Sequence, residues 1–329
     1  RDTSAHPSTC TVFCDFEGNN MVNIPQSNKA QGFVAGLASG ALSKGVAATI
    51  NAPFERARLL LQLQGFPGHI PHGQQYSGAI EALYRIPAEQ GVASLWRGNL
   101  ANITRFFPAY CLNAVLANKY KSLFPKYNAR TDYWKFFLIN TISGGLAGAM
   151  SLLLVFPLDL ARVRMALDVG TGPSRQFTGL IDCLSTIYQS GGLGALFSGF
   201  GASVVALVLY RALYFGMYDT YRQMTTRGGR RPSYFAAWLM AQGLTFTVTL
   251  ATYPLSTISR HLMMQAGAAT LTYTGAFDCA RSLFAAGGIS AFYGGVHVQL
   301  LAPIVAVLLS LLYDVVKSSH KQAPHKADA

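Results

Sequence analysis

Charged side chains are scarce in this sequence. They make up 12% of the 329 residues, whereas hydrophobic residues make up 51%, and soluble globular domains usually carry about 25% charged residues. Acidic residues are the scarcer sign: 14 Asp and Glu stand against 26 Lys and Arg, for a formal net charge of +12. This composition argues against soluble domains and indicates a membrane protein.

Cysteine is too rare and too scattered for a disulfide framework. There are five residues, an odd number, and Cys111, Cys183 and Cys279 lie in or beside apolar stretches. Cys10 and Cys14 belong to "CTVFC", which has no His and no second Cys pair nearby. We therefore expect no metal site there.

Signatures of enzymes and of nucleic-acid-binding domains are missing as well. The sequence contains no nucleophile and base set and no P-loop, and it has no RRM, zinc-finger or helix-turn-helix signature. We expect no catalysis and no cofactor. The basic excess is better matched by anionic lipid headgroups and an anionic solute than by nucleic acid.

Long apolar stretches, many of them rich in Gly and Ala, recur along the chain. Each is near the roughly 20 residues with which an α-helix crosses a bilayer, and small residues let such helices pack closely. We predict an all-α membrane protein with six transmembrane helices, at 31–62, 100–122, 135–167, 199–223, 234–265 and 296–317.

The chain also repeats itself three times. Pro53, Pro157 and Pro254 each stand near the end of an apolar stretch, and each is followed by two aromatic-X-Gly triplets with an amphipathic segment between them. That segment indicates a short helix on the membrane surface. Two crossings return the chain to its starting side, so the repeats are parallel and can close around a pseudo-threefold axis. The expected divisions are a polar extension (1–30), three repeats (31–125, 126–228, 229–317) and a polar tail (318–329); the two ends are either disordered or docking arms.

Two of the three prolines begin the pattern Pro-X-acid-X-X-base. A proline kinks a helix, which would bring the ends of three such helices together. Their acids and bases could then form a ring of ion pairs that closes one end of a central cavity. The third copy carries hydroxyls instead of charges, so the three pairs of positions are Glu55 with Arg58, Asp159 with Arg162, and Ser256 with Ser259.

The triplicated pattern resembles the signature of the mitochondrial carrier family, from about residue 31 to 317. Stretches such as "EQGVASLWRGNLANITRFFP", "PLDLARVRMALDVG" and "YRALYFGMYDTYR" are most similar to the ADP/ATP carriers within it. The resemblance implies a multi-pass, three-repeat bundle in the mitochondrial inner membrane. It also implies exchange of adenine nucleotides, or of another small anion, by alternating access.

In that family the motif charges form the gate on the matrix side. Its handedness implies a pair between Glu55 and Arg162, while Arg58 and Asp159 lose their usual partners and either stand unpaired or pair with each other. An unpaired buried charge costs about 3–5 kcal/mol, so a weaker gate is expected. The even helices imply an opposite, cytoplasmic gate, with Asn118 in place of one acid; its expected members are Lys121, Asp219, Arg222, Asp314 and Lys317.

The resemblance also implies a polyphosphate site with cations and an apolar or aromatic wall. Two positions depart from the family: Ala302 replaces an arginine, and the first-helix lysine matches Lys44 only if one helical turn is inserted before Pro53. Without that insertion it falls on Ala48. The implied site residues are Lys44, Arg105, Ala206, Leu207, Tyr210 and Arg211.

The aromatic-X-Gly triplets are expected to bind cardiolipin, again by resemblance. A glycine at a helix start exposes backbone N–H groups at the positive end of the helix dipole, which suits phosphate. The expected contacts are Gly78, Trp96, Arg97, Gly98, Gly179, Gly199, Gly275 and Gly295.

Motif charges are thus missing together from repeat 3 and from position 302, while the apolar residues remain. We expect adenine nucleotide antiport that is altered or lost. The alternative is a non-transporting structural subunit of an inner-membrane respiratory complex.

Overall fold

Long helices fill most of the chain that the computed structural model describes, which comprises residues 29–67, 69–123, 125, 132–227, 234–268 and 271–301. Five predicted spans are confirmed to within a few residues, whereas the sixth, 296–317, lies mostly outside the described residues. The five are α1 (Lys29–Leu63), α3 (Asn99–Leu123), α4 (Tyr133–Leu167), α6 (Phe200–Arg227) and α7 (Tyr234–Met264).

Two helical stretches of the described chain are long and apolar enough to cross a membrane on those criteria alone, Trp134–Leu167 and Phe200–Tyr218. Charges within α1, such as Glu55, Arg56 and Arg58, lower its apolar character. Helices that line a polar interior rather than face lipid on all sides show this composition.

Short helices confirm the predicted surface segments: α2 (Ala79–Gln90), α5 (Leu180–Leu196) and α8 (Ala276–Gly287). Near the end of each, a glycine with positive φ turns the chain, namely Gly91 (81°), Gly192 (62°) and Gly288 (63°). Glycine adopts this region without the penalty that a side chain brings. Short 3-10 turns complete the described elements: η2 (His72–Gln74), η3 (Val92–Trp96), η4 (Gly172–Ser174) and η5 (Gly288–Tyr293).

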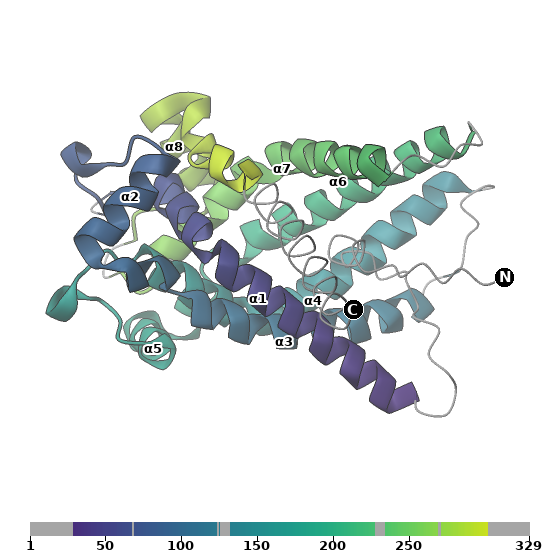
Figure 1. Ribbon diagram of the computed structural model, residues 1–329, viewed down its shortest axis with the longest axis horizontal. Helices are drawn as coiled ribbons and strands as arrows, with labels where there is room; N and C mark the ends of the chain where they lie inside the picture. Colours follow the sequence, from purple (N-terminus) through teal and green to yellow (C-terminus); the bar gives the residue numbers. More distant parts are fainter. Residues whose placement is uncertain are drawn as a thin grey trace, which may run out of the picture.

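The long helices converge at the end of the molecule that holds α2, α5 and α8, and spread apart toward the other end (Figure 1). Helix α3 packs between α1 and α4, and α6 packs between α4 and α7. Each of α1, α4 and α7 runs through its proline, Pro53, Pro157 or Pro254, as one helix. The order of neighbours therefore follows the order of the repeats.

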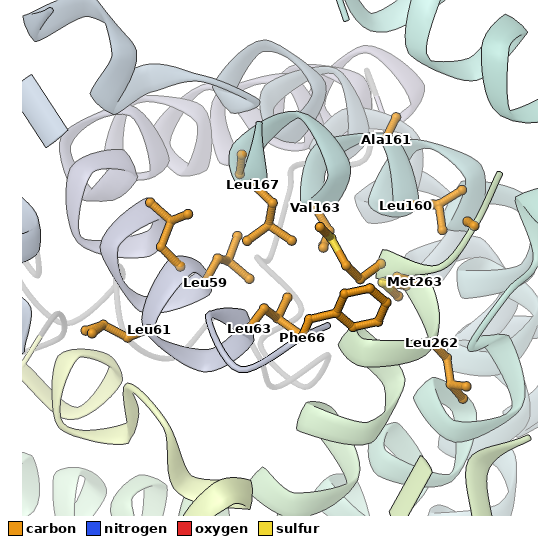
Figure 2. Packing of buried hydrophobic residues seen from close by; sticks show 14 of the residues in the cluster. Leu59, Leu61, Leu63, Phe66, Leu160, Ala161, Val163, Leu167, Leu262 and Met263 are labelled. Carbon is orange, nitrogen blue, oxygen red and sulfur yellow. The ribbon is translucent and has the colours of Figure 1, made fainter. Parts of the chain in front are cut away.

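Buried apolar side chains gather where the long helices converge, and Figure 2 shows their packing from close by. They come from the last turns of α1, α4 and α7 and from the inner faces of the surface helices, where Ile86, Ile187 and Leu283 are buried. Because the three odd helices meet here, the motif residues that follow their prolines are held close together. The residues labelled in Figure 2 are Leu59, Leu61, Leu63, Phe66, Leu160, Ala161, Val163, Leu167, Leu262 and Met263.

Candidate functional site

Glu55 and Arg162 form an ion pair between α1 and α4. Nη2 of Arg162 donates to Oε2 of Glu55, and their side chains are 13% and 34% exposed respectively. This contact confirms the predicted pairing. Little solvent screens the pair from the side of Arg162, so it holds the two helix ends together more firmly than a surface pair would.

Asp159 pairs with Arg105 of α3. Nη1 of Arg105 stands 3.1 Å from Oδ2 of Asp159, and Nη1 of Arg162 stands 3.9 Å from Oδ1. Asn102 supports Arg105 from the same helix, accepting a hydrogen bond of 3.3 Å. The expectation that Asp159 stands unpaired or pairs with Arg58 is therefore wrong, because an arginine of the predicted solute site takes its carboxylate.

Arg58 also finds a partner that the motif does not supply. Its side chain is buried, at 9% exposure, and Nη1 donates to Oε1 of Gln299 at 2.6 Å. Nε of Arg58 is buried without a hydrogen-bond partner in the described chain. A neutral amide thus stands where an ion pair would place a carboxylate.

The two serines of repeat 3 make only neutral contacts. Oγ of Ser256 donates to the carbonyl of Tyr253 on its own helix, at 2.7 Å. The hydroxyls of Ser259 and Ser203 are hydrogen-bonded to each other, and Ser259 also donates to the carbonyl of Gly199 at 3.3 Å. The junction between α6 and α7 therefore closes through hydroxyl groups.

Neutral hydrogen bonds also join α7 to α1 and to η5. Nε2 of Gln62 donates to Oγ1 of Thr257 at 2.6 Å, and Thr257 donates to the carbonyl of Phe292 at 2.7 Å. The hydroxyl of Tyr253 donates to the carbonyl of Gly294 at 2.6 Å. These three contacts of repeat 3 join uncharged groups only.

Three glycines let the start of each even helix approach the base position of the motif on an odd helix. Gly98, Gly199 and Gly295 have φ of 81°, 84° and 70°, and a Cβ on each would stand 2.7, 2.6 and 2.8 Å from a backbone oxygen. Nothing larger than glycine fits without displacing that backbone. The oxygens belong to Arg162, Ser259 and Arg58, in that order.

Arg56 joins the C-terminal part of α1 to the C-terminal end of α4 through hydrogen bonds. It is 1% exposed and donates to the carbonyls of Ala166 at 3.0 Å and Asp168 at 3.1 Å, to Oε1 of Gln90 at 2.6 Å, and to the carbonyl of Ser94. Four acceptors from three elements converge on one guanidinium. This residue occupies a variable place of the motif, so the motif gave no signal for it.

Arg97 lies beside Arg56 and shares one of its acceptors, the carbonyl of Asp168. Its Nη1 donates to the carbonyls of Asp168 at 2.7 Å and Gly170 at 2.8 Å. Partial burial, together with the nearby Arg175, lowers the pKa of Arg97. Trp96 donates from Nε1 to the carbonyl of Thr49 at 2.9 Å. Both side chains of this triplet therefore make contacts within the protein.

Two of the predicted solute-site residues of α6, Leu207 and Arg211, face α4. Arg211 donates to the carbonyl of Gly144, and a Cβ at Gly148 would stand 2.9 Å from Cζ of Arg211 and 3.0 Å from Cδ2 of Leu207. Tyr210 stacks on Tyr214 with ring centroids 6.0 Å apart. Ala206 is partly buried on the same helix.

The surface helices begin in one shared way. Gly78, Gly179 and Gly275 precede α2, α5 and α8 with extended backbone. A carboxylate in the first turn of each helix accepts the N–H of the residue before the glycine, from Ser77, Thr178 and Thr274. These hydrogen bonds lower the pKa of Glu81 and Asp182. Lipid binding at these helix starts stays a prediction.

Several predicted residues fall outside what the structure describes. The side chains of Lys44, Lys121, Asp219 and Arg222 are among them, whereas Ala48 is described and buried, at 7% exposure. Within the described residues, no three His, Cys, Asp or Glu side chains are grouped as a metal site requires. Positions 302, 314 and 317 lie beyond the described chain: Ala302, Asp314 and Lys317.

Comparison with known proteins agrees with this geometry. The family profile described as "Mitochondrial carrier protein" matches residues 29–128, 133–229 and 231–323. The chain is 45% identical over 287 residues to the "ADP,ATP carrier protein" of Parachlorella kessleri, covering 87% of the chain and 84% of that relative. It is 43% identical over 292 residues to "ADP/ATP translocase 2" of Bos taurus, covering 88% of the chain and 96% of the relative.

The chain belongs to the mitochondrial carrier family. It is therefore a six-span, three-repeat protein of the mitochondrial inner membrane, and a transporter by family rather than an enzyme. Within this carrier, ion pairs bring Glu55, Asp159 and Arg162 together, and their role as a gate stays a prediction. The structure adds Arg105, Gln299 and Arg56 to their surroundings.

Proposed function

We propose that this carrier exchanges adenine nucleotides across the inner membrane by alternating access. The relatives named above are ADP/ATP carriers, which supports a nucleotide as solute. The observation that carries the proposal is the ion pair of Arg105 with Asp159 at 3.1 Å, because it joins a cation of the solute site to an acid of the gate. A phosphate that binds Arg105 competes for the same guanidinium, so solute binding loosens the gate.

The solute site would hold phosphates by cations and the adenine ring by the α6 wall. Arg105 and Arg211 each supply a guanidinium, which can bind two phosphate oxygens at once through two N–H donors. Tyr210, stacked on Tyr214, offers an aromatic surface, and Leu207 and Ala206 extend the apolar wall. Lys44 is included in this proposal through its place in α1.

The closed gate of this carrier rests on fewer charges than three full repeats would supply. The Glu55–Arg162 and Arg105–Asp159 pairs close two sides, while the side of repeat 3 closes through Ser259, Ser203 and the amide of Gln299. A gate held by weaker contacts opens at lower cost, so altered exchange kinetics are part of the proposal. The cytoplasmic gate comprises Lys121, Asp219, Arg222, Asp314 and Lys317.

A second candidate, a non-transporting structural subunit of an inner-membrane complex, is favoured by one observation. Ser256 and Ser259 carry no charge, and Arg58 meets only an amide, so the gate has lost charges on a whole side. In either role, cardiolipin is the proposed bound lipid, held by the glycine-started helices. Their backbone N–H groups suit its phosphates.

The deciding experiment is exchange of labelled ADP by the full chain in cardiolipin-containing liposomes. Native exchange that is lost in Arg105→Ala would support nucleotide antiport. An Ala302→Arg variant, measured in parallel, tests whether a restored cation raises the rate. No exchange by the native chain, together with exchange by Ala302→Arg, would instead indicate a carrier that has lost transport and has a structural role.

A further inference from the structure

The gate of this carrier contains more cations than carboxylates. Each carboxylate is already engaged, Glu55 by Arg162 and Asp159 by Arg105. Two positive side chains are left without a carboxylate partner among the described residues. The four cations that gather here are Arg58, Arg105, Arg162 and Arg260.

Arg58 and Arg260 are the two cations in question. Arg58 is buried, its Nη1 donates to Gln299, and its Nε has no partner in the described chain. Arg260 is partly buried in α7 and makes no hydrogen bond or ion pair with any described residue. Its charged neighbours are Arg58 and Arg162, which repel it, and Glu55 and Asp159, whose carboxylates already bind Arg162 and Arg105.

The threefold pattern shows where a counter-charge would belong. The acid position of α1, Glu55, reaches the base position of α4, Arg162. By the same threefold relation, the acid position of α7, which is Ser256, would reach the base position of α1, which is Arg58. The side chain of Ser256 is short, and its hydroxyl donates back to the carbonyl of Tyr253 on its own helix. Next to Arg58 the described chain therefore supplies the neutral amide of Gln299 but no carboxylate, and Nε of Arg58 stays without a partner there.

We propose that a small inorganic oxyanion of the phosphate class binds beside Ser256, between Arg58 and Arg260, and closes the repeat 3 side of the gate. Guanidinium groups bind such oxyanions through paired N–H donors, and Nε of Arg58 is an available donor. Two like charges held close together in a partly desolvated site repel each other strongly unless an anion lies between them. The bound anion takes the place of a missing side chain and acts as a structural counter-ion.

This site goes beyond nucleotide exchange and does not depend on it, because the anion stabilises the closed gate whether or not a solute is transported. The experiment therefore contains no nucleotide in its main arm. The purified full chain, in cardiolipin-containing detergent micelles, is unfolded thermally at increasing inorganic phosphate. Ionic strength is held constant with gluconate. A ligand that binds only the folded state raises the midpoint in a saturable way, and we expect a rise of a few degrees that saturates at millimolar phosphate.

A matched pair of variants separates this site from general salt effects. Ser256→Asp supplies the missing carboxylate, so it should raise the midpoint without phosphate and abolish the further rise. Ser256→Asn is similar in size but uncharged, and it should keep the phosphate response. Arg260→Gln removes one of the two cations and should shift the phosphate dependence to at least tenfold higher concentration.

Three results would overturn the proposal. One is a phosphate effect that does not saturate and is equal in the native chain and Ser256→Asp, since phosphate also stabilises folded proteins by exclusion from their surface. Another is a midpoint in Ser256→Asp that equals or falls below that of Ser256→Asn. The third is stabilisation by ADP but not by phosphate, which would assign the cations to the solute alone.

Discussion

Arg105 of α3 and Asp159 of α4 form an ion pair with 3.1 Å between Nη1 and Oδ2. In three equivalent repeats the acid of α4 would face a base of α7, but Ser259 stands at that position and bonds to Ser203. Asp159 turns instead to an arginine outside the motif. A single side chain of this carrier, Arg105, thus belongs both to the proposed solute site and to the proposed gate.

Breaking this pair should destabilise the closed carrier. Arg105 and Asp159 are 20% and 18% exposed, so solvent replaces the lost contact only partly. Asp159→Asn should lower the free energy of unfolding by about 3 kcal/mol, the usual scale for an uncompensated, mostly buried partner. Thermal or denaturant unfolding of the purified carrier measures the change.

The double variant provides the control for this prediction. In the Asp159→Asn background, Arg105→Gln should lower the free energy of unfolding much less than it does in the native chain. The effects of substitutions at two residues in contact are not additive. Equal effects in the two backgrounds would show that the pair contributes nothing as a pair. Asp159→Asn also keeps the carbonyl oxygen, so a purely steric loss is excluded.

Gly98 and Gly199 should tolerate no side chain. Both have positive φ, and a Cβ would stand 2.7 and 2.6 Å from the carbonyl oxygens of Arg162 and Ser259. The conformation alone costs about 1–2 kcal/mol, and overpacking adds about 1–3 kcal/mol. Gly98→Ala and Gly199→Ala should each lower the unfolding free energy by at least about 2 kcal/mol.

Gly201 is the matched control for these two glycines. It lies in α6, close to Gly199, with open space at its Cβ position and no positive φ. Gly201→Ala should be neutral or stabilising by up to about 1 kcal/mol, since Ala favours helix. If Gly199→Ala behaved like Gly201→Ala, the close approach of α6 to α7 would not be required.

Arg56 should not be replaceable by lysine. Its guanidinium reaches the carbonyls of Ala166 and Asp168 and the side chain of Gln90 at once, whereas an ammonium on a flexible stem cannot span all of them. Arg56→Lys should lower the unfolding free energy by about 2–4 kcal/mol, because buried acceptors lose their donors. Limited proteolysis near residue 168 would report the loosened end of α4.

Arg85 offers the comparison on the outside of the molecule. It pairs with Glu81 at 3.1 Å and Glu89 at 2.6 Å along α2. Exposed pairs of this kind contribute about 0.5 kcal/mol or less. Arg85→Lys should therefore leave the free energy of unfolding nearly unchanged. An equal loss in Arg56→Lys and Arg85→Lys would show that the buried hydrogen bonds of Arg56 have no special role.

The sequence was sufficient for the helices and for one gate contact. The length and threefold recurrence of the apolar stretches located α1, α3, α4, α6 and α7, since by hydropathy alone only two helical stretches of the described chain qualify. The pair of Glu55 with Arg162 was also predictable, because both residues lie in repeated motif positions and the handedness implied by the family resemblance selects which acid meets which base. Repetition alone would equally have allowed Asp159 to pair with Arg58.

The remaining gate contacts could not be predicted from the motif. Arg105 and Gln299 lie outside it, on even helices, so no pattern linked them to Asp159 and Arg58. Which side chain replaces a missing motif partner depends on side-chain length and on the space around it. Arg56 shows the same limit: its position in the motif is variable, and only the packed ends of α1 and α4 reveal its four acceptors.

Cys183 and Cys279 should resist alkylation in the folded carrier. Both are fully buried, at 0% exposure, on the inner faces of α5 and α8. Burial raises the pKa of each thiol from 9.0 to about 12. The thiolate is the reactive form, so at pH 8 both residues should label with maleimide far more slowly than in the carrier unfolded by detergent, as read by mass spectrometry of peptides.

The same shift predicts how stability depends on alkaline pH. A thiol whose pKa is higher in the folded than in the unfolded state binds its proton more tightly when folded. Its contribution is constant below about pH 9, and stability falls as the pH rises from there toward about 12, because only the unfolded chain ionises readily. Cys183→Ser with Cys279→Ser should flatten this part of the profile. An unchanged alkaline slope in the double variant, or rapid labelling of either thiol at pH 8, would contradict the burial of these surface-helix cores.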